Sequence, residues 1–260
     1  MSLPWALAIA LLATGLLPAG CNRPKQRYKP AVLATQSDVS RYVLLALEHD
    51  DADVRRSAIQ QIARTRHAGL PVALDAFALA ARTDPSESVR CAAIRALGEH
   101  QGDKTVNTMI VLLTTTEEPS GVRPAGAGVR WEASRVLCNA VRSDAIGESS
   151  RRVVRAVAVD RLERDASRDV RLTAAKLLGY DPDLVCVRAL IGSLRQRDFG
   201  VVYEAERSLM RLTGKSHEHD AARWSRWLDA TADPFAQRGA LDAKLDSDSR
   251  RGLWPFRKRS

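Results

Sequence analysis

The residues best suited to chemistry form a short polar run near the C-terminal end, where residues 217–220 read His-Glu-His-Asp. Imidazole and carboxylate groups this close together could bind a metal ion or act as a general acid and base. Two further His–acid pairs, at 48–49 and 99–100, have the reversed order Glu-His. On a turn that precedes a helix, the run at 217–220 is more simply explained as polar surface and an N-cap.

Other patterns that support catalysis are missing from the sequence. It contains no Gly-rich phosphate loop, no G-x-S-x-G nucleophile elbow and no recognisable Cys–His constellation. Cys91, Cys138 and Cys186 lack C-x-x-C or zinc-ligand spacing, and each falls in a helical pattern, so we expect small packing residues. We therefore predict that the protein is not an enzyme and that it binds no metal and no cofactor.

The N-terminal region contains an apolar stretch from Trp5 to Leu17, followed by Leu-Pro-Ala-Gly-Cys ending at Cys21. This resembles a bacterial lipoprotein signal peptide, in which small residues precede a cysteine that is lipidated. The resemblance implies a signal peptide at 1–20, lipidation of Cys21, and a lipid-anchored domain in the cell envelope outside the cytoplasm. Pro18 departs from the pattern, which usually has Leu there, and no Lys or Arg precedes the apolar stretch.

An uncleaved signal anchor is the alternative, because basic residues follow the apolar stretch. They are Arg23, Lys25, Arg27 and Lys29. By the positive-inside rule, this arrangement would place the folded domain in the cytoplasm. In both cases residues 21–36, rich in Pro, Lys and Gln, predict a tether between the membrane and the domain. We expect no nucleic-acid partner if the domain is exported.

Internal repetition is the strongest signal in the sequence. Five segments share a Val, an Ala four residues later and an Ile or Leu eight residues later. The Val positions are Val54, Val89, Val129, Val170 and Val201, spaced by 35, 40, 41 and 31 residues. Offsets of zero, four and eight share one face of an α-helix, so these residues are expected to face a core.

A second apolar-periodic segment precedes each of these helices. The five segments lie at about 38–49, 70–83, 104–115, 149–164 and 183–196. Turn residues such as Asp separate the two helices, and an Asp before a helix accepts hydrogen bonds from its first N–H groups. Because one helical pair is too small to bury its own apolar face, the five pairs must stack. The sequence thus predicts an all-α solenoid over residues 37–213.

The repeated pattern D-x-D/S-V-R-x-x-A-x-x-x-L resembles HEAT and HEAT-like (PBS-lyase-type) repeats. The resemblance implies a right-handed solenoid in which the Arg after the Val pairs with an Asp in a neighbouring turn. The matching arginines are Arg55, Arg90, Arg130 and Arg171. Val202 replaces the Arg in the fifth repeat, so this ladder should end there. A Gly- and Pro-rich insertion at 117–128 is expected to be a surface loop.

Some HEAT-like proteins are enzymes, either lyases or hydroxylases that bind iron through His-Glu pairs in two halves of the chain. This sequence has a single His-Glu pair, at 217–218. The reversed pairs at 48–49 and 99–100 fall at the ends of non-equivalent helices, so they do not recur as such a site requires. An enzyme of this class remains the weakest of the alternatives.

The C-terminal part resembles the closing segment of exported bacterial HEAT-repeat proteins. The resemblance rests on Thr213-Gly214, a downstream Asp and the W-x-x-W motif of Trp224 and Trp227. It predicts a capping helix within 214–231 that covers the end of the core. Periodicity then disappears, and residues 232–260, with five basic residues among the last eleven, are expected to be disordered and to touch anionic surfaces.

Two positions of each repeat fall opposite the core, six and two residues after the Val. At the sixth position stand Gln60, Arg95, Arg135, Lys176 and Arg207, and at the second Arg56, Cys91, Trp131, Leu172 and Tyr203. We call these ten positions the second-helix face. In HEAT-like arrays this surface is generally concave, and basic side chains with aromatics bind carboxylate-rich or phosphate-bearing ligands. A merely solvated face is the alternative, because Glu132 and Glu204 adjoin it.

These features predict a non-catalytic, membrane-tethered scaffold that binds a protein partner along the concave face of the solenoid. The expected contact residues are Arg95, Trp131, Arg135, Lys176, Tyr203 and Arg207. The alternative is a polyanion-binding module with steep salt dependence that uses the basic positions and the C-terminal tail. A formal net charge of +9 is compatible with anionic partners but is not by itself a nucleic-acid signature.

Overall fold

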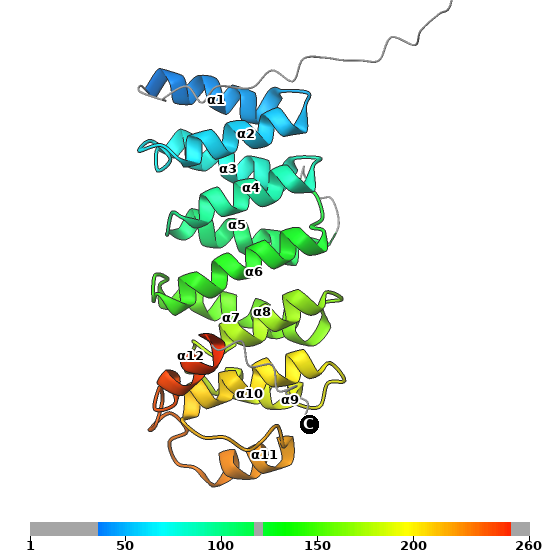
Figure 1. The fold of residues 1–260 in the computed structure, drawn as a ribbon, viewed down its shortest axis with the longest axis vertical. Helices are drawn as coiled ribbons and strands as arrows, with labels where there is room; N and C mark the ends of the chain where they lie inside the picture. The colour runs from blue at the N-terminus through cyan, green and yellow to red at the C-terminus, as the bar shows by residue number, and fades with distance from the viewer. Residues whose placement is uncertain (1–35, 117–121, 251–260) are drawn as a thin grey trace, which may run out of the picture. The chain divides into compact units, whose positions relative to one another are not determined.

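The computed structural model describes residues 36–116 and 122–250 of the chain. Within these ranges it contains twelve α-helices and no β-strand. The fold is an all-α solenoid of stacked helical pairs, as the repeats predict (Figure 1). The predicted signal peptide, Cys21 and the predicted tether up to residue 35 lie outside the described residues.

The helix order matches the predicted pairs. In chain order the helices are α1 (Gln36–Glu48), α2 (Ala52–Ala63), α3 (Pro71–Thr83), α4 (Glu87–Gly98), α5 (Asp103–Thr114), α6 (Ala127–Arg142), α7 (Glu148–Arg164), α8 (Arg168–Leu178), α9 (Leu184–Ser193), α10 (Phe199–Thr213), α11 (Ala221–Ala230) and α12 (Asp242–Arg250). From α1 to α10, each odd-numbered helix is the first of a pair and each even-numbered helix is the second.

The pairs form two layers. The second helices contact one another in the order α2, α4, α6, α8, α10, and the first helices in the order α1, α3, α5, α7, α9. The two helices of each pair also pack together, so the core lies between the layers. Four of the repeat valines are fully buried, and Val54 in the first repeat is only partly buried. Side chains of the second helices that point away from this core therefore share one surface.

Local capping sets where several helices begin and end. The Asp51 carboxylate accepts from the Asp53 N–H at 2.8 Å at the start of α2, and Asp198 accepts from Gly200 at 2.9 Å at the start of α10. These bonds satisfy N–H groups that have no partner within the helix. Helix α10 stops at Gly214, whose φ of +67° is left-handed and disfavoured for residues with a Cβ.

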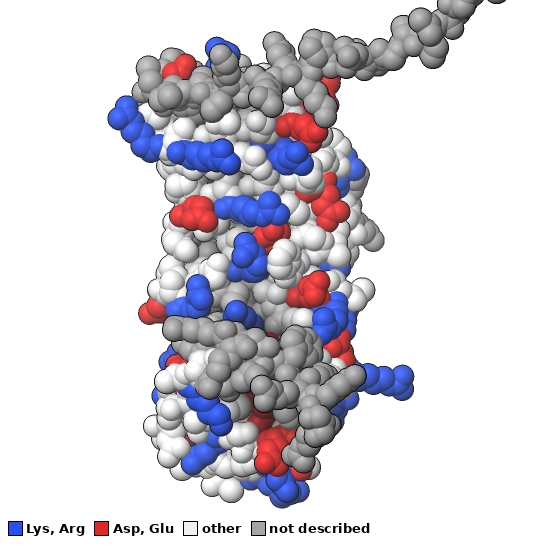
Figure 2. Space-filling model, viewed as in Figure 1, with Lys and Arg blue, Asp and Glu red and all other residues white. Residues whose placement is uncertain are grey.

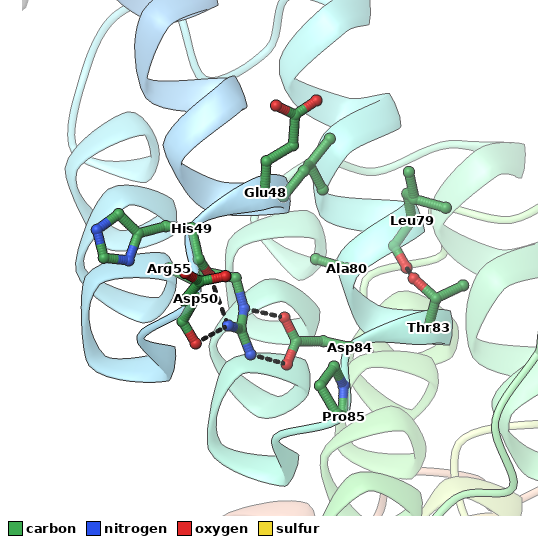
Figure 3. Close-up of a pocket in the computed structure, with 10 residues that line it drawn as sticks. Glu48, His49, Asp50, Arg55, Leu79, Ala80, Thr83, Asp84 and Pro85 are labelled. Atoms are coloured by element: carbon green, nitrogen blue, oxygen red, sulfur yellow. Dashed lines mark hydrogen bonds and ion pairs between the residues drawn. The ribbon is translucent and has the colours of Figure 1, made fainter.

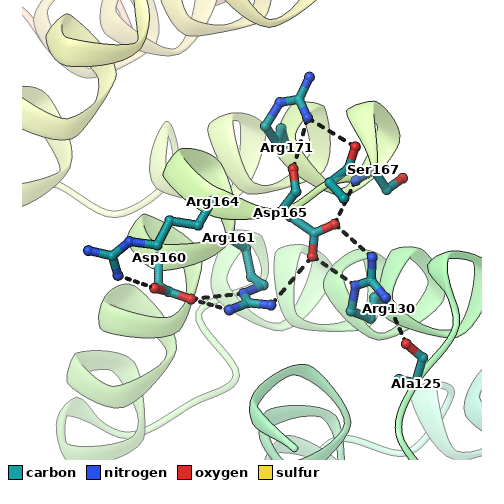
Figure 4. Close-up of polar contacts among 9 residues, drawn as sticks. Ala125, Arg130, Asp160, Arg161, Arg164, Asp165, Ser167 and Arg171 are labelled. Atoms are coloured by element: carbon teal, nitrogen blue, oxygen red, sulfur yellow. Dashed lines mark hydrogen bonds and ion pairs between the residues drawn. The ribbon is translucent and has the colours of Figure 1, made fainter. Parts of the chain in front are cut away.

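An Arg–Asp ladder joins consecutive repeats. Arg55 donates from Nε and Nη2 to the two carboxylate oxygens of Asp84, at 2.7 and 2.9 Å (Figure 3). Arg130 makes the same bidentate pair with Asp165, at 2.8 and 2.9 Å (Figure 4). Both aspartates are almost completely buried, so each would be costly to leave unpaired. These arginines therefore hold the array together, as their place in the repeat predicts.

Arg171 continues the ladder with longer contacts. It donates to the backbone carbonyl of Asp165 at 2.8 Å and reaches the Asp198 carboxylate at 3.4 Å (Figure 4 shows the first). Burial alone would raise the pKa of the Asp165 carboxyl, but the hydrogen bonds from Arg130 and the Ser167 N–H hold that pKa below its usual range. Asp165 therefore stays ionised and links the third repeat to the fourth.

The ladder differs from the prediction at Arg90, which pairs with no carboxylate of the described residues. Its guanidinium donates instead to the backbone carbonyls of Ala81, Pro124 and Arg123, at 2.9, 3.0 and 2.9 Å. The physical reason is the insertion before α6, which puts Arg123 and Pro124 where the other repeats have a turn with an Asp. Arg90 thus anchors the part of this loop that the structure describes.

Helix α11 covers the end of the first-helix layer by packing against α9. It lies within 214–231, where the sequence predicts a capping helix. Trp224 is fully buried, and its ring meets that of Trp227 edge-on at a centroid distance of 5.4 Å. Two large aromatic rings therefore close the apolar end of the core.

Residues 232–250 differ from the predicted disordered tail. Phe235 packs against the core, and α12 (Asp242–Arg250) packs on α10, as Figure 1 shows in red. Leu245 of α12 is only 3% exposed. A nine-residue helix with so few apolar residues gives no periodic signal, so its position depends on tertiary contacts.

Candidate functional site: the second-helix face

Arg95 on α4 and Arg135 on α6 share one carboxylate, that of Glu132. Arg95 Nε donates to Oε1 at 2.7 Å, and Arg135 Nε donates to Oε2 at 3.1 Å. The Glu132 side chain is 3% exposed, whereas those of Arg95 and Arg135 are 54% and 47% exposed. A buried carboxylate thus fixes two exposed guanidinium groups on the surface. Figure 2 shows Lys and Arg side chains along the array with acidic side chains among them.

Trp131 adds an apolar surface beside these charges. It is 38% exposed, and the guanidinium carbon of Arg135 lies 5.6 Å from its ring centroid, within cation–π distance. We call Arg95, Trp131, Glu132 and Arg135 the Glu132 cluster. It brings together three of the six predicted contact residues, in an arrangement that offers both charge and stacking to a ligand.

A groove between α2 and α4 extends this surface toward the N-terminal end of the array. Its volume is about 570 Å³, and it is lined by Arg56, Gln60, Glu87, Ser88, Cys91 and Arg95. Four of these residues belong to the second-helix face. Because Arg95 takes part in both the groove and the Glu132 cluster, the two features form one continuous surface.

The other three predicted residues are arranged differently. Lys176 on α8 is exposed, whereas Tyr203 and Arg207 on α10 are partly buried. Tyr203 stacks on His219 with ring centroids 6.2 Å apart, and the Arg207 guanidinium carbon lies 5.9 Å from the Tyr203 ring. Arg207 Nη2 also donates to the backbone carbonyl of Leu245 in α12, at 2.9 Å. The structure therefore joins Tyr203 to Arg207, but they contact the chain's own C-terminal region.

Glu204 on α10 occupies the repeat position of Glu132 with a different outcome. It makes no hydrogen bond or ion pair with any described residue. Burial raises the pKa of its carboxyl, against the opposing charges of Arg207, Arg211 and Lys176. The same repeat position therefore holds a paired carboxylate in α6 and a desolvated, unpaired one in α10.

The His-Glu-His-Asp run forms a loop around the buried carboxylate of Glu206. This carboxylate accepts hydrogen bonds from Ser216 Oγ at 2.9 Å, from the backbone N–H groups of His217 and His219 at 3.0 and 3.2 Å, and from Trp224 Nε1 at 2.6 Å. The His217 ring meets Trp224 edge-on at 4.6 Å. In the described part of the chain, no group of three or more His, Cys, Asp or Glu could hold a metal ion. The run therefore builds the cap.

The cysteines have the environment of packing residues. Cys138 and Cys186 are buried, and burial raises the pKa of their thiols to about 11 and about 12. Cys91 is partly exposed at the groove, and burial raises its thiol pKa as well. A nucleophilic cysteine needs a lowered pKa, so none of the three supports covalent catalysis.

A second cavity, of about 360 Å³, lies beside Arg55 at the turn between α1 and α2 (Figure 3). Arg55 already uses its donors on Asp84 and on the carbonyls of His49 and Asp50, at 2.7 and 2.9 Å. Its guanidinium therefore has a structural role.

Two glutamates are central to the structure, although the sequence singles out neither as a site residue. Glu132 could have been found, because an acid stands three residues after the Val only in the third and fifth repeats. Such an acid lies near basic residues of its own and the preceding repeat, and among the described residues it forms an ion pair at Glu132 but not at Glu204. Glu206 gives no comparable signal, since its four donors come from a loop and a helix that only the fold brings near.

Comparison with known proteins supports the repeat architecture. A protein-family model described as HEAT repeats matches residues 40–125, from within α1 to the loop after α5. No curated protein matches the sequence. One similar solved structure is an engineered protein from the Northeast Structural Genomics Consortium, with 20% identity and a TM-score of 0.47, over 82% of this chain and 99% of that chain.

No helix within the described ranges is both long and apolar enough to span a bilayer. HEAT repeats are generally protein-interaction scaffolds and are typically non-catalytic. Residues 40–125 thus match a repeat type that generally serves protein interaction.

Proposed function

We propose that this protein is a membrane-tethered scaffold that binds a protein partner on the N-terminal half of its second-helix face. The observation that carries the proposal is the Glu132 cluster, in which a buried carboxylate holds two exposed arginines beside an exposed Trp131. Trp and Arg are the residue types most enriched where binding energy concentrates in protein interfaces. The arrangement is also fixed before a partner arrives, which lowers the entropic cost of binding.

The same cluster favours a protein over a polyanion as partner. Glu132 neutralises part of the charge of Arg95 and Arg135, and Arg207 is engaged with α12. A uniformly basic row, which a polyanion needs, is therefore interrupted in both halves of the face. A partner with carboxylates and an apolar side chain complements the guanidinium groups and the indole at once. An enzyme of the HEAT-like class has no such observation in its favour.

Site-specific cross-linking tests the proposed face. A photoreactive amino acid replaces Trp131 in one variant and Val153 in another; Val153 is 47% exposed on the first-helix layer. In cells that make the protein, we expect a discrete cross-linked protein adduct from position 131, lost when Arg95→Ala is added. Equal adducts from both positions, or none from 131, would contradict the proposal.

The polyanion alternative has its own readout. Retention of the purified chain on an immobilised polyphosphate or sulfated polymer would fall steeply with salt if several basic residues bound it. We expect weak retention, little changed by Arg95→Ala or Arg135→Ala. Strong retention that both substitutions reduce would favour the polyanion-binding hypothesis instead.

The tether is part of the proposal and rests on the sequence from Trp5 to Cys21 alone. Intact mass and membrane fractionation after expression in a bacterial host test it, with Cys21→Ala as the matched control. A mature N-terminus at Cys21 that carries acyl chains, absent in the control, is the expected result. A full-length, unacylated chain in the membrane would instead indicate a signal anchor, and an unprocessed soluble chain would indicate no tether.

A further inference from the structure

The C-terminal segment from Phe235 to Arg250, which includes α12, lies against the C-terminal half of the second-helix face. The backbone carbonyl of Leu245 accepts a hydrogen bond from Arg207 Nη2 at 2.9 Å. The Gly239 N–H donates to the backbone carbonyl of Arg211 at 3.0 Å. These contacts place the segment on α10, where Arg207 is one of the positions that the repeat pattern assigns to the binding surface.

Two more contacts fix the path of the segment. Arg238 Nη2 donates to the backbone carbonyl of Tyr180, at the end of α8, at 3.3 Å. Gly214 approaches Gln237 so closely that a Cβ on Gly214 would stand 2.3 Å from the Gln237 carbonyl oxygen. The segment therefore touches the turn that follows α8 as well as α10.

The segment changes what the repeat positions present to solvent. Arg95, Arg135 and Arg207 hold the same position in their repeats, but only Arg207 is withdrawn from solvent and bonded to α12. Since the helices that carry them pack in one continuous row, the repeat geometry does not explain the difference. The docked segment does.

The docked arrangement is incompletely satisfied. Arg211 Nη1 is buried and has no hydrogen-bond partner within the described ranges. Glu204, two turns before, is partly buried and has no hydrogen bond or ion pair with the described residues, and burial raises the pKa of its carboxyl. Buried polar groups without hydrogen bonds destabilise the state that contains them. A short segment held by a few hydrogen bonds over such groups can dissociate when a partner that satisfies them binds in its place.

We propose that residues 235–250 are a built-in ligand that covers the second-helix face at Arg207 on α10 and that a partner must displace to use this part of the face. The docking itself is a property of this chain alone. Only the role of the surface that is exposed when the segment dissociates rests on the proposed function. The covered surface includes Arg207 and Arg211, and release of the segment extends the binding surface from the Glu132 cluster toward the cap.

Competition in trans tests the docking on the full-length chain. The probe is a fluorescent peptide of residues 232–250, and its binding is measured by anisotropy to wild type and to Leu245→Asp. The substitution puts a charge at a buried position and should free the face. A tethered segment has an effective concentration on the order of 1 mM, so a peptide with a Kd of about 100 µM should bind wild type about tenfold more weakly than the variant.

Matched controls make the result specific. Ala240→Asp changes an exposed residue of the same segment and should bind the peptide as weakly as wild type. A peptide with the Leu245→Asp change should bind neither chain. Circular dichroism and thermal melting show whether the array of each variant is folded. Equal peptide binding to wild type and to Leu245→Asp, or binding to neither, would overturn the proposal.

A second measurement does not depend on the Leu245 variant or on a peptide. Trypsin cleavage after Lys244 should be faster in Arg207→Ala than in wild type, because the bond to the Leu245 carbonyl is lost, and unchanged in Arg95→Ala. Equal cleavage rates in Arg207→Ala and wild type would count against the docked segment. Both tests are independent of cross-linking at position 131, so failure of the scaffold proposal and failure of this one are distinguishable.

Discussion

The two halves of the second-helix face use the same repeat positions for different purposes. In the N-terminal half, Glu132 pairs with two arginines, whose side chains remain about half exposed. In the C-terminal half, Arg207 bonds to α12, and Glu204 forms no hydrogen bond or ion pair within the described ranges. The repeat therefore determines where a side chain points, and the segment lying over it determines whether a partner can reach it.

The halves also differ in how they stabilise a buried acid. Glu132 faces solvent-accessible guanidinium groups, which water can hydrate if the carboxylate is removed. Glu206 faces the indole N–H of a fully buried Trp224 and the N–H groups of a loop. In that loop Glu218 and His219 have left-handed φ values of +54° and +66°, a strained conformation that the Glu206 carboxylate supports. The C-terminal half should therefore be the more sensitive to loss of one carboxylate.

The largest expected effect is that of Glu206→Ala. We expect a loss of about 3 kcal/mol in the free energy of unfolding, because the buried Trp224 N–H and the cap loop lose their acceptor. The matched change Glu132→Ala should cost only about 1 kcal/mol, since its arginines are exposed and can be hydrated. Urea unfolding of both variants measures this. Equal losses of unfolding free energy would contradict the prediction that Glu206 stabilises the chain more than Glu132.

A smaller effect is expected for Gly214→Ala. A left-handed φ of +67° and a Cβ within 2.3 Å of the Gln237 carbonyl oxygen should together destabilise the chain by about 2 kcal/mol. The change should also accelerate trypsin cleavage after Lys244. Gly102→Ala is the control, because its φ of +148° is strained too but no atom lies within 4 Å of the added Cβ. Faster cleavage in the control would show that strain alone, and not the close approach, releases the segment.

The smallest effect has opposite signs in the two halves. Glu204→Gln should stabilise the protein at pH 7 by about 1 kcal/mol, because a folded-state pKa raised by burial means that ionisation costs stability. This cost is absent below the unfolded-state pKa of about 4.3 and appears as pH rises above it, so the gain should vanish at low pH. Glu132→Gln should instead destabilise at pH 7 by about 1 kcal/mol, since it loses a charge-assisted pair. Unfolding curves of both variants at several pH values test these opposite signs. A loss of stability in Glu204→Gln at pH 7 would contradict the raised pKa.

The ladder shows how far the repeat pattern reaches. Its Arg55 and Arg130 pairs are predictable, because each combines a fixed offset from the repeat Val with an Asp one repeat later. Arg90 escapes the pattern because an insertion removes the Asp, and backbone carbonyls of the loop take its place. An Arg side chain has five donors and can bond to carboxylates or to backbone carbonyls. The sequence alone does not predict which acceptors it uses.

By itself, the sequence determined the all-α solenoid, its five pairs and the core face of each second helix. Those features repeat at a fixed period, and helical geometry turns an offset of four into a shared face. It also placed Arg95, Trp131 and Arg135 on one surface. Only the tertiary structure decided that Glu132 clamps two of them, that Glu206 holds the cap and that the C-terminal segment covers Arg207. These features depend on contacts that do not recur from repeat to repeat, so the sequence contains no periodic pattern that predicts them.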